Sequence, residues 1–236
     1  MKKKIVSLVL VAALAFTALV GTTLAYFTDE DDATNVMTLG NVAIEQYEKD
    51  KEGADFEQNQ PLFPMVDKKG NEPTVVDGFF NEKMANVIDK VVTVENTGTV
   101  PAYVRTILAF ETGVVYNADG SVYGDAHDVY IGVLGDFEYL KDGEDFVKVT
   151  VDNTQYVLAV KVYEEALDPA AETDPSLKQF FLAPTANNEV TTLFGEEYTI
   201  LALSQGVQTE GFDSAEDALN TAFGEVTAEN AAIWFN

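Results

Sequence analysis

Few residues of this sequence are of the types that carry enzyme chemistry. His127 is the only histidine, and the 236 residues include no cysteine. A zinc peptidase usually holds its metal with two histidines one helical turn apart, as in HExxH, and a Ser-His-Asp set needs a histidine of its own. Neither HExxH nor GxSxG occurs. We therefore expect no catalytic residues and no enzyme activity, and we interpret His127, in YGDAHDVY, as a loop residue.

Carboxylates are the abundant reactive groups. The chain has 40 Asp and Glu against 14 Lys and Arg, a net charge of −26. Hard oxygen ligands suit Ca²⁺, and the weak candidates near turns or in acidic runs are Asp29, Asp31, Asn117 and Asp119. They lack the spacing and the final glutamate of an EF-hand, so a solvated acidic loop is the alternative interpretation. We expect no cofactor other than calcium.

The charge also excludes classes of partner. Arg105 is the only arginine, and beyond Lys2 to Lys4 the sequence has no basic run. A strongly negative surface repels nucleic acid and anionic lipid. We expect no nucleic-acid partner.

The N-terminus has the three parts of a secretory signal peptide. Three lysines are followed by an apolar stretch over residues 5–20 and by the small residues of GTTLA. We place cleavage between Ala25 and Tyr26, which makes residues 1–25 the signal peptide. An uncleaved signal anchor is the alternative and would be the only contact with a membrane. Both interpretations export the chain, and without cysteine the exported part has no disulfide.

The rest of the chain is typical of an all-β protein. Residues 40–48, 89–112, 152–167 and 196–208 alternate β-branched and aromatic residues, and 128–134 and 145–151 are shorter candidates. The 89–112 stretch divides into two strands at Asn96-Thr97-Gly98, and turn signals separate the others at spacings typical of sandwiches and barrels. Residues 56–78, with three of the seven prolines, predict a long connection.

One or two short helices are expected near the C-terminus. Ser214 precedes an amphipathic pattern in which Ala215, Leu219, Ala222 and Phe223 share a face, and Gly224 follows it. Residues 227–235 predict a second helical turn. We expect Trp234 and Phe235 to fill part of the core.

Three segments of the chain resemble the TasA/camelysin family of Firmicutes, whose signal peptides are cut by the dedicated signal peptidase SipW. They are AYFTDEDDATNVMTLGNVAIE, KVVTVENTGTVPAYVRTIL and ALSQGVQTEGFDSAEDALNTAF. The resemblance implies a secreted antiparallel jelly-roll β-sandwich over residues 40–236. It implies assembly with copies of itself into fibres of the biofilm matrix or the cell surface of a Gram-positive bacterium, with an accessory anchoring protein as a further partner.

The resemblance also implies a role for residues 26–39. In fibres of the TasA type, the mature N-terminal segment leaves its own subunit and completes a sheet of the next. Here the donor strand would include Tyr26, Phe27, Thr28, Val36 and Met37. The sheets that receive or support it would contain Val42, Ile44, Val92, Val94, Val104 and Ile107. An acidic, frayed N-terminus is the alternative.

Two other functions remain open at this stage. Camelysin is classed as a metallopeptidase, which the single histidine disfavours in this chain. A monomeric surface adhesin that binds carbohydrate or host protein would use the same scaffold.

Overall fold

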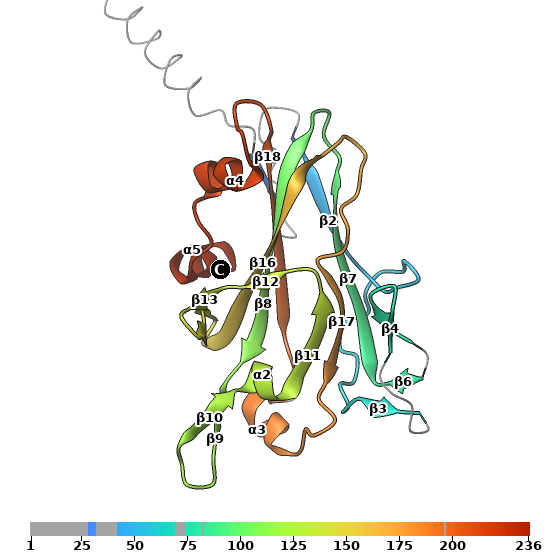
Figure 1. The fold of residues 1–236 in the computed structure, drawn as a ribbon, viewed down its shortest axis with the longest axis vertical. Helices are drawn as coiled ribbons and strands as arrows, with labels where there is room; N and C mark the ends of the chain where they lie inside the picture. The colour runs from blue at the N-terminus through green and yellow to red at the C-terminus, as the bar shows by residue number, and fades with distance from the viewer. Residues whose placement is uncertain (1–27, 32–41, 69–73, 82, 196) are drawn as a thin grey trace, which may run out of the picture.

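The computed structural model describes residues 28–31, 42–68, 74–81, 83–195 and 197–236, and most of them lie in antiparallel β-structure (Figure 1). The strands are β1 Thr28–Asp31, β2 Ile44–Lys49, β3 Val66–Asp67, β4 Val75–Val76, β5 Phe79–Phe80, β6 Met84–Ala85, β7 Val87–Asn96, β8 Ala102–Thr112, β9 Val114–Tyr116, β10 Val122–Asp125, β11 Ile131–Gly135, β12 Glu138–Tyr139, β13 Lys141–Asp142, β14 Asp145–Phe146, β15 Lys148–Val151, β16 Thr154–Leu167, β17 Leu177–Leu182 and β18 Ile200–Gln208. The helices are α2 Ala126–Tyr130, α3 Glu189–Phe194, α4 Ala215–Phe223 and α5 Ala228–Trp234.

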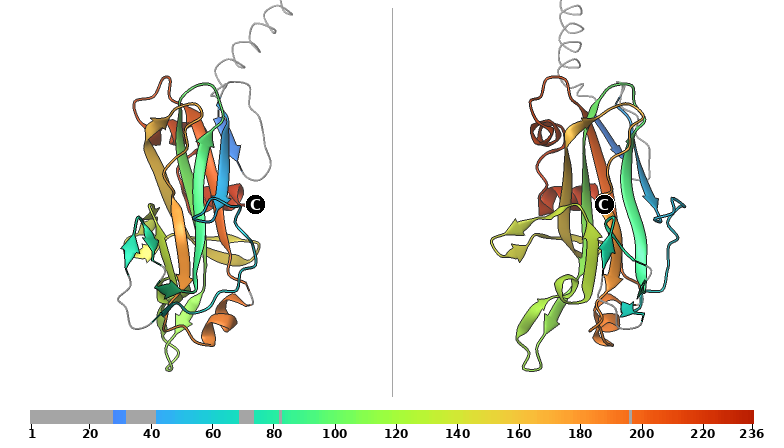
Figure 2. Two further views of the ribbon diagram at one scale, coloured as in Figure 1. Left: turned by 90° about the vertical axis from the view of Figure 1, so that its right-hand side faces the viewer. Right: turned by 45° about the vertical axis from the view of Figure 1, so that its right-hand side comes forward.

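Two sheets make up the body of the molecule. A six-stranded sheet has the order β1-β18-β8-β16-β12, with β15 also paired to β16, and a four-stranded sheet has the order β11-β17-β7-β2. The strand pairs within both sheets are antiparallel. The two views of Figure 2 show the sheets as two layers whose long strands run side by side. The apolar strand faces are therefore covered on the side where the layers meet.

The core between the layers takes side chains from both. One cluster joins Ile44 and Val94 of the four-stranded sheet to Val104 of the six-stranded sheet, and a second joins Val92 and Leu177 to Phe110. The apolar residues predicted to lie in the sheets are all at most 3% exposed: Val42, Ile44, Val92, Val94, Val104 and Ile107. For Ile44, Val92, Val94 and Val104 this burial confirms the inward face predicted from the period-two pattern, whereas Ile107, three residues after Val104, lies on the other face of β8.

The turn between β7 and β8 is built on Asn96, as the sequence predicts. Its fully buried side-chain amide donates to the carbonyls of Val100 and Leu167, at 2.9 and 2.8 Å, and its side-chain oxygen accepts from Gly98 N at 2.9 Å. These three bonds satisfy a buried amide and fix the turn that carries the chain from one sheet to the other.

Helices α4 and α5 cover the outer face of the six-stranded sheet (Figure 1). Ser214 caps α4 by accepting a hydrogen bond from Asp217 N at 3.1 Å, and Thr227 caps α5 in the same way. Both predicted C-terminal helices are confirmed. Trp234 and Phe235 are only partly buried, against the cluster around Leu158. No helix in the described part of the chain is long and apolar enough to span a membrane.

The structure departs from the predictions in three places. Strand β17 was not predicted, although it is central to the four-stranded sheet. The candidate strand 128–134 is divided, since its first three residues belong to α2 and the rest to β11. The predicted loop position of His127 is wrong, because this residue lies in α2 and is 3% exposed. In its described residues, 56–68 and 74–78, the predicted connection contains the two-residue strands β3 and β4.

Candidate functional site at a sheet edge

The short strand β1 forms one edge of the six-stranded sheet. It pairs antiparallel with the C-terminal half of β18, with Thr28 opposite Val207 and Asp31 opposite Ser204. Four residues far from β18 in sequence are thus held to the sheet by main-chain pairing. The edge of a sheet offers unpaired N–H and C=O groups to any extended segment, whatever its side chains.

The backbone direction of β18 shows which of its groups face this edge. The carbonyl of Thr199, just before the strand, accepts from Glu111 N on the β8 side, whereas the carbonyl of Ala202 accepts from Gln46 on the opposite side. Because main-chain groups alternate along a strand, Ser204 and Gly206 point the same way as Ala202. Their partners in the register are Asp31 and Asp29. Asp29 and Asp31 therefore carry the β1 main-chain groups that face β18.

A polar contact fixes the part of β18 that lies beyond β1. Gln46 of β2 donates its amide to Ala202 O at 3.3 Å and accepts from Ser204 Oγ at 2.6 Å. Ser204 Oγ also lies 3.1 Å from Thr106 Oγ1, and both hydroxyls are fully buried. A side chain from the other sheet thus takes the place of a strand at Ala202.

Gly206 allows β2 to approach this edge. A methyl group on Gly206 would lie 2.8 Å from Cγ2 of Ile44, well inside normal contact. A strand glycine often marks such a close approach. The absence of a side chain lets the two sheets converge beside β1.

The predicted donor residues are placed only in part. Thr28 lies in β1, as do the calcium candidates Asp29 and Asp31. The cleavage pair Ala25 and Tyr26, and the donor residues Phe27, Val36 and Met37, lie outside the described residues. Sequence reasoning did not identify β18 as the strand that pairs with β1. Its long apolar pattern was visible, but strand order is not a local property of a sequence.

The other two calcium candidates lie in the turn between β9 and β10. Asn117 donates to Ser121 Oγ at 3.0 Å, and Asp119 accepts from Ser121 N at 2.9 Å. Hydrogen bonds that Asp119 Oδ1 accepts from the Ser121 hydroxyl and from Ser121 N lower the pKa of Asp119. Nowhere in the described ranges do three His, Cys, Asp or Glu side chains gather in a way that could hold a metal ion.

His127 is held between two tyrosines. Its Nε2 lies 2.8 Å from the hydroxyl of Tyr139 and its Nδ1 lies 3.2 Å from that of Tyr198, while Phe110 stacks on the ring at 5.0 Å between centroids. Burial lowers the pKa of His127 to about 4. The imidazole is neutral and both of its nitrogens are engaged, which is the state of a satisfied core residue.

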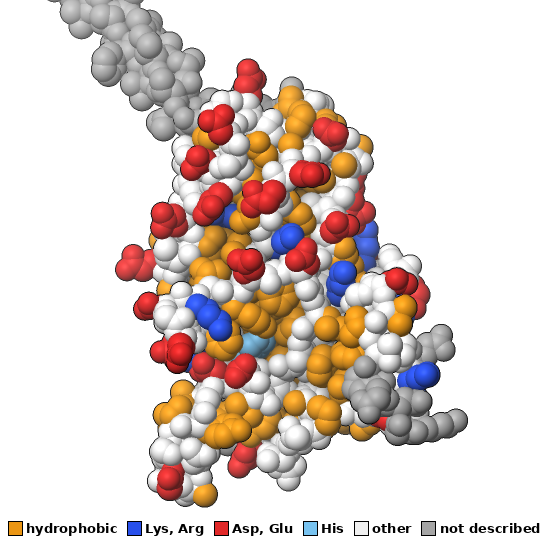
Figure 3. Space-filling model, in the orientation of Figure 1, with side chains coloured by type: hydrophobic (Ala, Val, Ile, Leu, Met, Phe, Trp, Pro, Cys, Tyr) orange, Lys and Arg blue, Asp and Glu red, His pale blue; other side chains and the backbone are white. Residues whose placement is uncertain are grey.

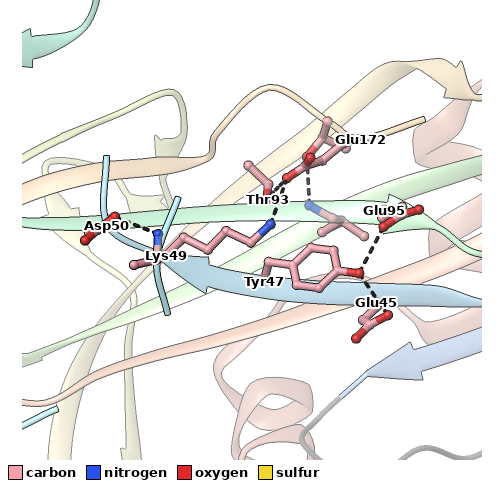
Figure 4. Close-up of polar contacts among 10 residues, drawn as sticks. Glu45, Tyr47, Lys49, Asp50, Thr93, Glu95 and Glu172 are labelled. Carbon is pink, nitrogen blue, oxygen red and sulfur yellow. Dashed lines mark hydrogen bonds and ion pairs between the residues drawn. The ribbon is translucent and has the colours of Figure 1, made fainter. Parts of the chain in front are cut away.

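A carboxylate cluster lies on the outward face of β2 and β7 (Figure 4). The Tyr47 hydroxyl is 2.9 Å from carboxylate oxygens of both Glu95 and Glu45, and Lys49 lies 3.9 Å from Glu172. Hydrogen bonds to Glu95 and Glu45 raise the pKa of Tyr47 well above its usual range. The phenol therefore stays protonated, so it is not poised as a base or a nucleophile.

The single arginine lies beneath α4. Arg105 is 1% exposed and donates to Gln205 Oε1, Asn220 Oδ1 and Gly224 O at 2.8, 2.9 and 2.8 Å. It borders a cavity of about 370 Å³ whose lining includes Leu140, Val160, Val162, Glu216, Leu219 and Val226. The guanidinium joins the end of α4 to the sheet, which is a structural role.

Of these sites, the β1–β18 edge alone offers a surface that a second polypeptide can occupy by main-chain pairing. The histidine, tyrosine and arginine groups are each satisfied by neighbours within the chain. Searches against protein-family models, curated proteins and solved structures found no match to this chain.

Proposed function

We propose that this protein is a secreted structural subunit that assembles with copies of itself into extracellular or cell-surface fibres. In this proposal, a SipW-type signal peptidase removes residues 1–25, and the new N-terminal segment of one copy takes the place of β1 on the next. The sandwich would have jelly-roll topology, and an accessory protein would anchor the fibre to the cell.

The observation that carries the proposal is the pairing of β1 with the edge of β18. Thr28–Asp31 adds to the sheet through main-chain hydrogen bonds, which another copy can supply without any change of sequence. A segment that can pair within its own chain and between chains is the usual element of a strand exchange. The resemblance to TasA-type proteins in the segment AYFTDEDDATN supports the same role.

The surface charge is compatible with an exported subunit that must not aggregate before it assembles. Figure 3 shows acidic side chains spread over the visible face and only a few lysine or arginine side chains. Residues 26–236 have 40 acidic and 11 basic residues, a net charge of −29 that keeps copies apart in solution. Association therefore needs a specific contact, and a paired strand provides one.

The first experiment compares the mature chain, beginning at Tyr26, with a chain that lacks residues 26–35. Negative-stain electron microscopy and sedimentation would score fibres, and circular dichroism would score folding. We expect fibres only from the mature chain, and a folded monomer from the shortened one. Fibres from the shortened chain would contradict the proposal.

A matched pair of variants tests the role of main-chain pairing. Asp29→Pro removes an N–H that faces β18, whereas Glu30→Pro removes one that faces away from it. Each substitution also removes one carboxylate, so the change of charge is the same. We expect Asp29→Pro to prevent fibres and Glu30→Pro to permit them. Equal behaviour of the two variants would show that the segment acts by some means other than strand pairing.

A further inference from the structure

The hairpin formed by β9 and β10 exposes large apolar side chains. Tyr116, Val122 and Tyr123 are 61%, 66% and 64% exposed, and Val122 is directly opposite Tyr116 in the register. Figures 1 and 2 show the hairpin projecting from the body of the molecule. We call these three side chains the hairpin face. Tyrosine is enriched where proteins bind one another, because it buries a large area with little loss of side-chain freedom.

The tip of this hairpin is held in one conformation. Asn117 N donates to Ser121 O at 2.8 Å, and the side chains of Asn117, Asp119 and Ser121 are hydrogen bonded to one another. The exposed apolar groups are therefore presented by a defined β-ribbon, and such preorganisation lowers the entropic cost of binding.

A second exposed apolar surface lies on the opposite side of the lower body (Figures 1 and 2). It consists of two small ribbons, β3–β6 and β4–β5, which are joined through Asn81: its N donates to Thr74 O, and its O accepts from Met84 N. We call it the flank patch. Its exposed members are Val66, Val75 and Val76 of these ribbons together with Phe63, which lies just before β3, and they are 48% to 55% exposed. The hairpin and the two ribbons lie on different sides of the body, so the hairpin face and the flank patch do not meet within one copy (Figures 1 and 2).

The two surfaces share a low net charge in a strongly acidic chain. Between Val114 and Gly124 the only charged residue is Asp119. Among the described residues between Phe63 and Lys83, two acids are balanced by two lysines, and Lys178 adds a further positive charge beside Phe79. Two mature copies, each with 40 acidic and 11 basic residues, repel each other over most orientations. The orientation that brings these two surfaces together places little net negative charge at the contact.

We propose that the hairpin face of one copy docks on the flank patch of the next, as a second contact along the fibre; this inference rests on the proposed function. A contact between two different surfaces is heterologous and repeats without closing, which is the geometry of a filament. A few exposed side chains fall short of the roughly 800 Å² per partner of a stable interface. The contact therefore forms together with strand exchange and adds to its strength.

The test uses engineered cysteines, since the natural chain has none. Mature chains with Tyr123→Cys and with Val76→Cys would be mixed, assembled and oxidised, and dimers would be scored on non-reducing gels. The two thiols meet only if the two surfaces meet. We expect the mixture to cross-link roughly tenfold faster than either variant alone, because a contact raises the effective concentration of the two thiols.

Ile233→Cys supplies the matched control, because Ile233 is an apolar residue of α5 that is 72% exposed. Its mixture with Tyr123→Cys should cross-link no faster than the single variants. A fourth variant, Tyr116→Ser with Tyr123→Ser, should raise the protein concentration needed for fibres while the monomer stays folded.

The outcomes separate this inference from the function on which it rests. Fibres with preferential Tyr123→Cys to Val76→Cys cross-links support it. Fibres without such preference, or with Tyr123→Cys cross-linked mainly to itself, overturn the second contact and leave the strand exchange standing. A wild-type mature chain that forms no fibres overturns the proposed function and this contact with it.

Discussion

Burial keeps His127 neutral in the folded protein, and this makes stability depend on pH. Its pKa falls from 6.5 to about 4, because burial disfavours the charged form more than Asp125 favours it. Below pH 6.5 the unfolded chain takes up a proton that the folded chain does not, so the free energy of unfolding falls as pH decreases. The full loss, below pH 4, is roughly 3 kcal/mol.

Comparison with His127→Gln isolates this effect from the titration of the 40 acids. Urea unfolding at pH 7, 5.5 and 4 should show the wild type as the more stable protein at pH 7. The difference between the two should shrink by roughly 3 kcal/mol at pH 4, since glutamine does not titrate. A difference that stays constant with pH would mean that the pKa of His127 is the same in the folded and unfolded states.

Arg105 shows how one planar side chain can join three partners. Its guanidinium donates to Gln205, Asn220 and Gly224, which lie on β18, in α4 and just after α4. Lysine keeps the positive charge but lacks the planar guanidinium, whose N–H groups reach three acceptors at once. Arg105→Lys should therefore lower the free energy of unfolding by about 2 to 3 kcal/mol. Urea unfolding measures the change, and Lys141→Arg, at an exposed site, should leave stability unaltered. If the free energy of unfolding of Arg105→Lys were unaltered, water would be replacing the guanidinium as the hydrogen-bond donor to these partners.

Among the elements, α4 depends on its cap. Ser214 Oγ accepts from Asp217 N at 3.1 Å, and Ser214→Ala should lower stability by about 1 kcal/mol, whereas Ser214→Asp should retain it. Trp234 is the only tryptophan and lies in the neighbouring helix α5, so its fluorescence reports on this end of the chain. Equal stability of the alanine and aspartate variants would contradict a role for the cap.

Patterns carried by neighbouring residues predicted the elements well. The β-branched and aromatic residues of β2, β7, β8, β16 and β18 mark strands, of which β8 is buried on both faces. The turn at Asn96 and the cap at Ser214 follow from side chains that bond nearby backbone. Strand β17 was missed because Leu177–Leu182 has two-faced burial in mid-sheet, with no clear alternation of polar residues.

The candidate site was less accessible to such reasoning. The sequence singled out the N-terminal segment, and Thr28–Asp31 does form a strand, but its partner β18 lies more than 170 residues away. Register between distant strands depends on the whole sheet, as the contacts of Gln46 with Ala202 and Ser204 illustrate. The environment of His127 was missed for the same reason, since Tyr198 is 71 residues distant.

At the scale of the whole molecule, charge and edge pairing act in opposite directions. The sheet edge can pair with any extended segment, whereas the net charge of −29 on residues 26–236 makes two copies repel each other. The balance between them would keep subunits apart until a donor strand is free. This balance depends on screening, because exposed charges interact over a Debye length of about 10 Å at 0.1 M salt.

Fibre assembly of the mature chain should therefore speed up as NaCl rises from about 0.01 to 0.15 M, a range in which the Debye length shortens from roughly 30 to 8 Å. Light scattering at fixed protein concentration measures the rate, and sucrose at matched osmolality is the control. Assembly in CaCl₂ at the same ionic strength tests the calcium candidates Asp29, Asp31, Asn117 and Asp119. Equal assembly rates in CaCl₂ and NaCl indicate screening alone. A faster rate in CaCl₂ that Asp119→Asn abolishes indicates a bound calcium ion. Slower assembly in NaCl would contradict the balance, because it would mean that attraction between opposite charges, rather than relief of repulsion between acidic copies, limits the rate of contact.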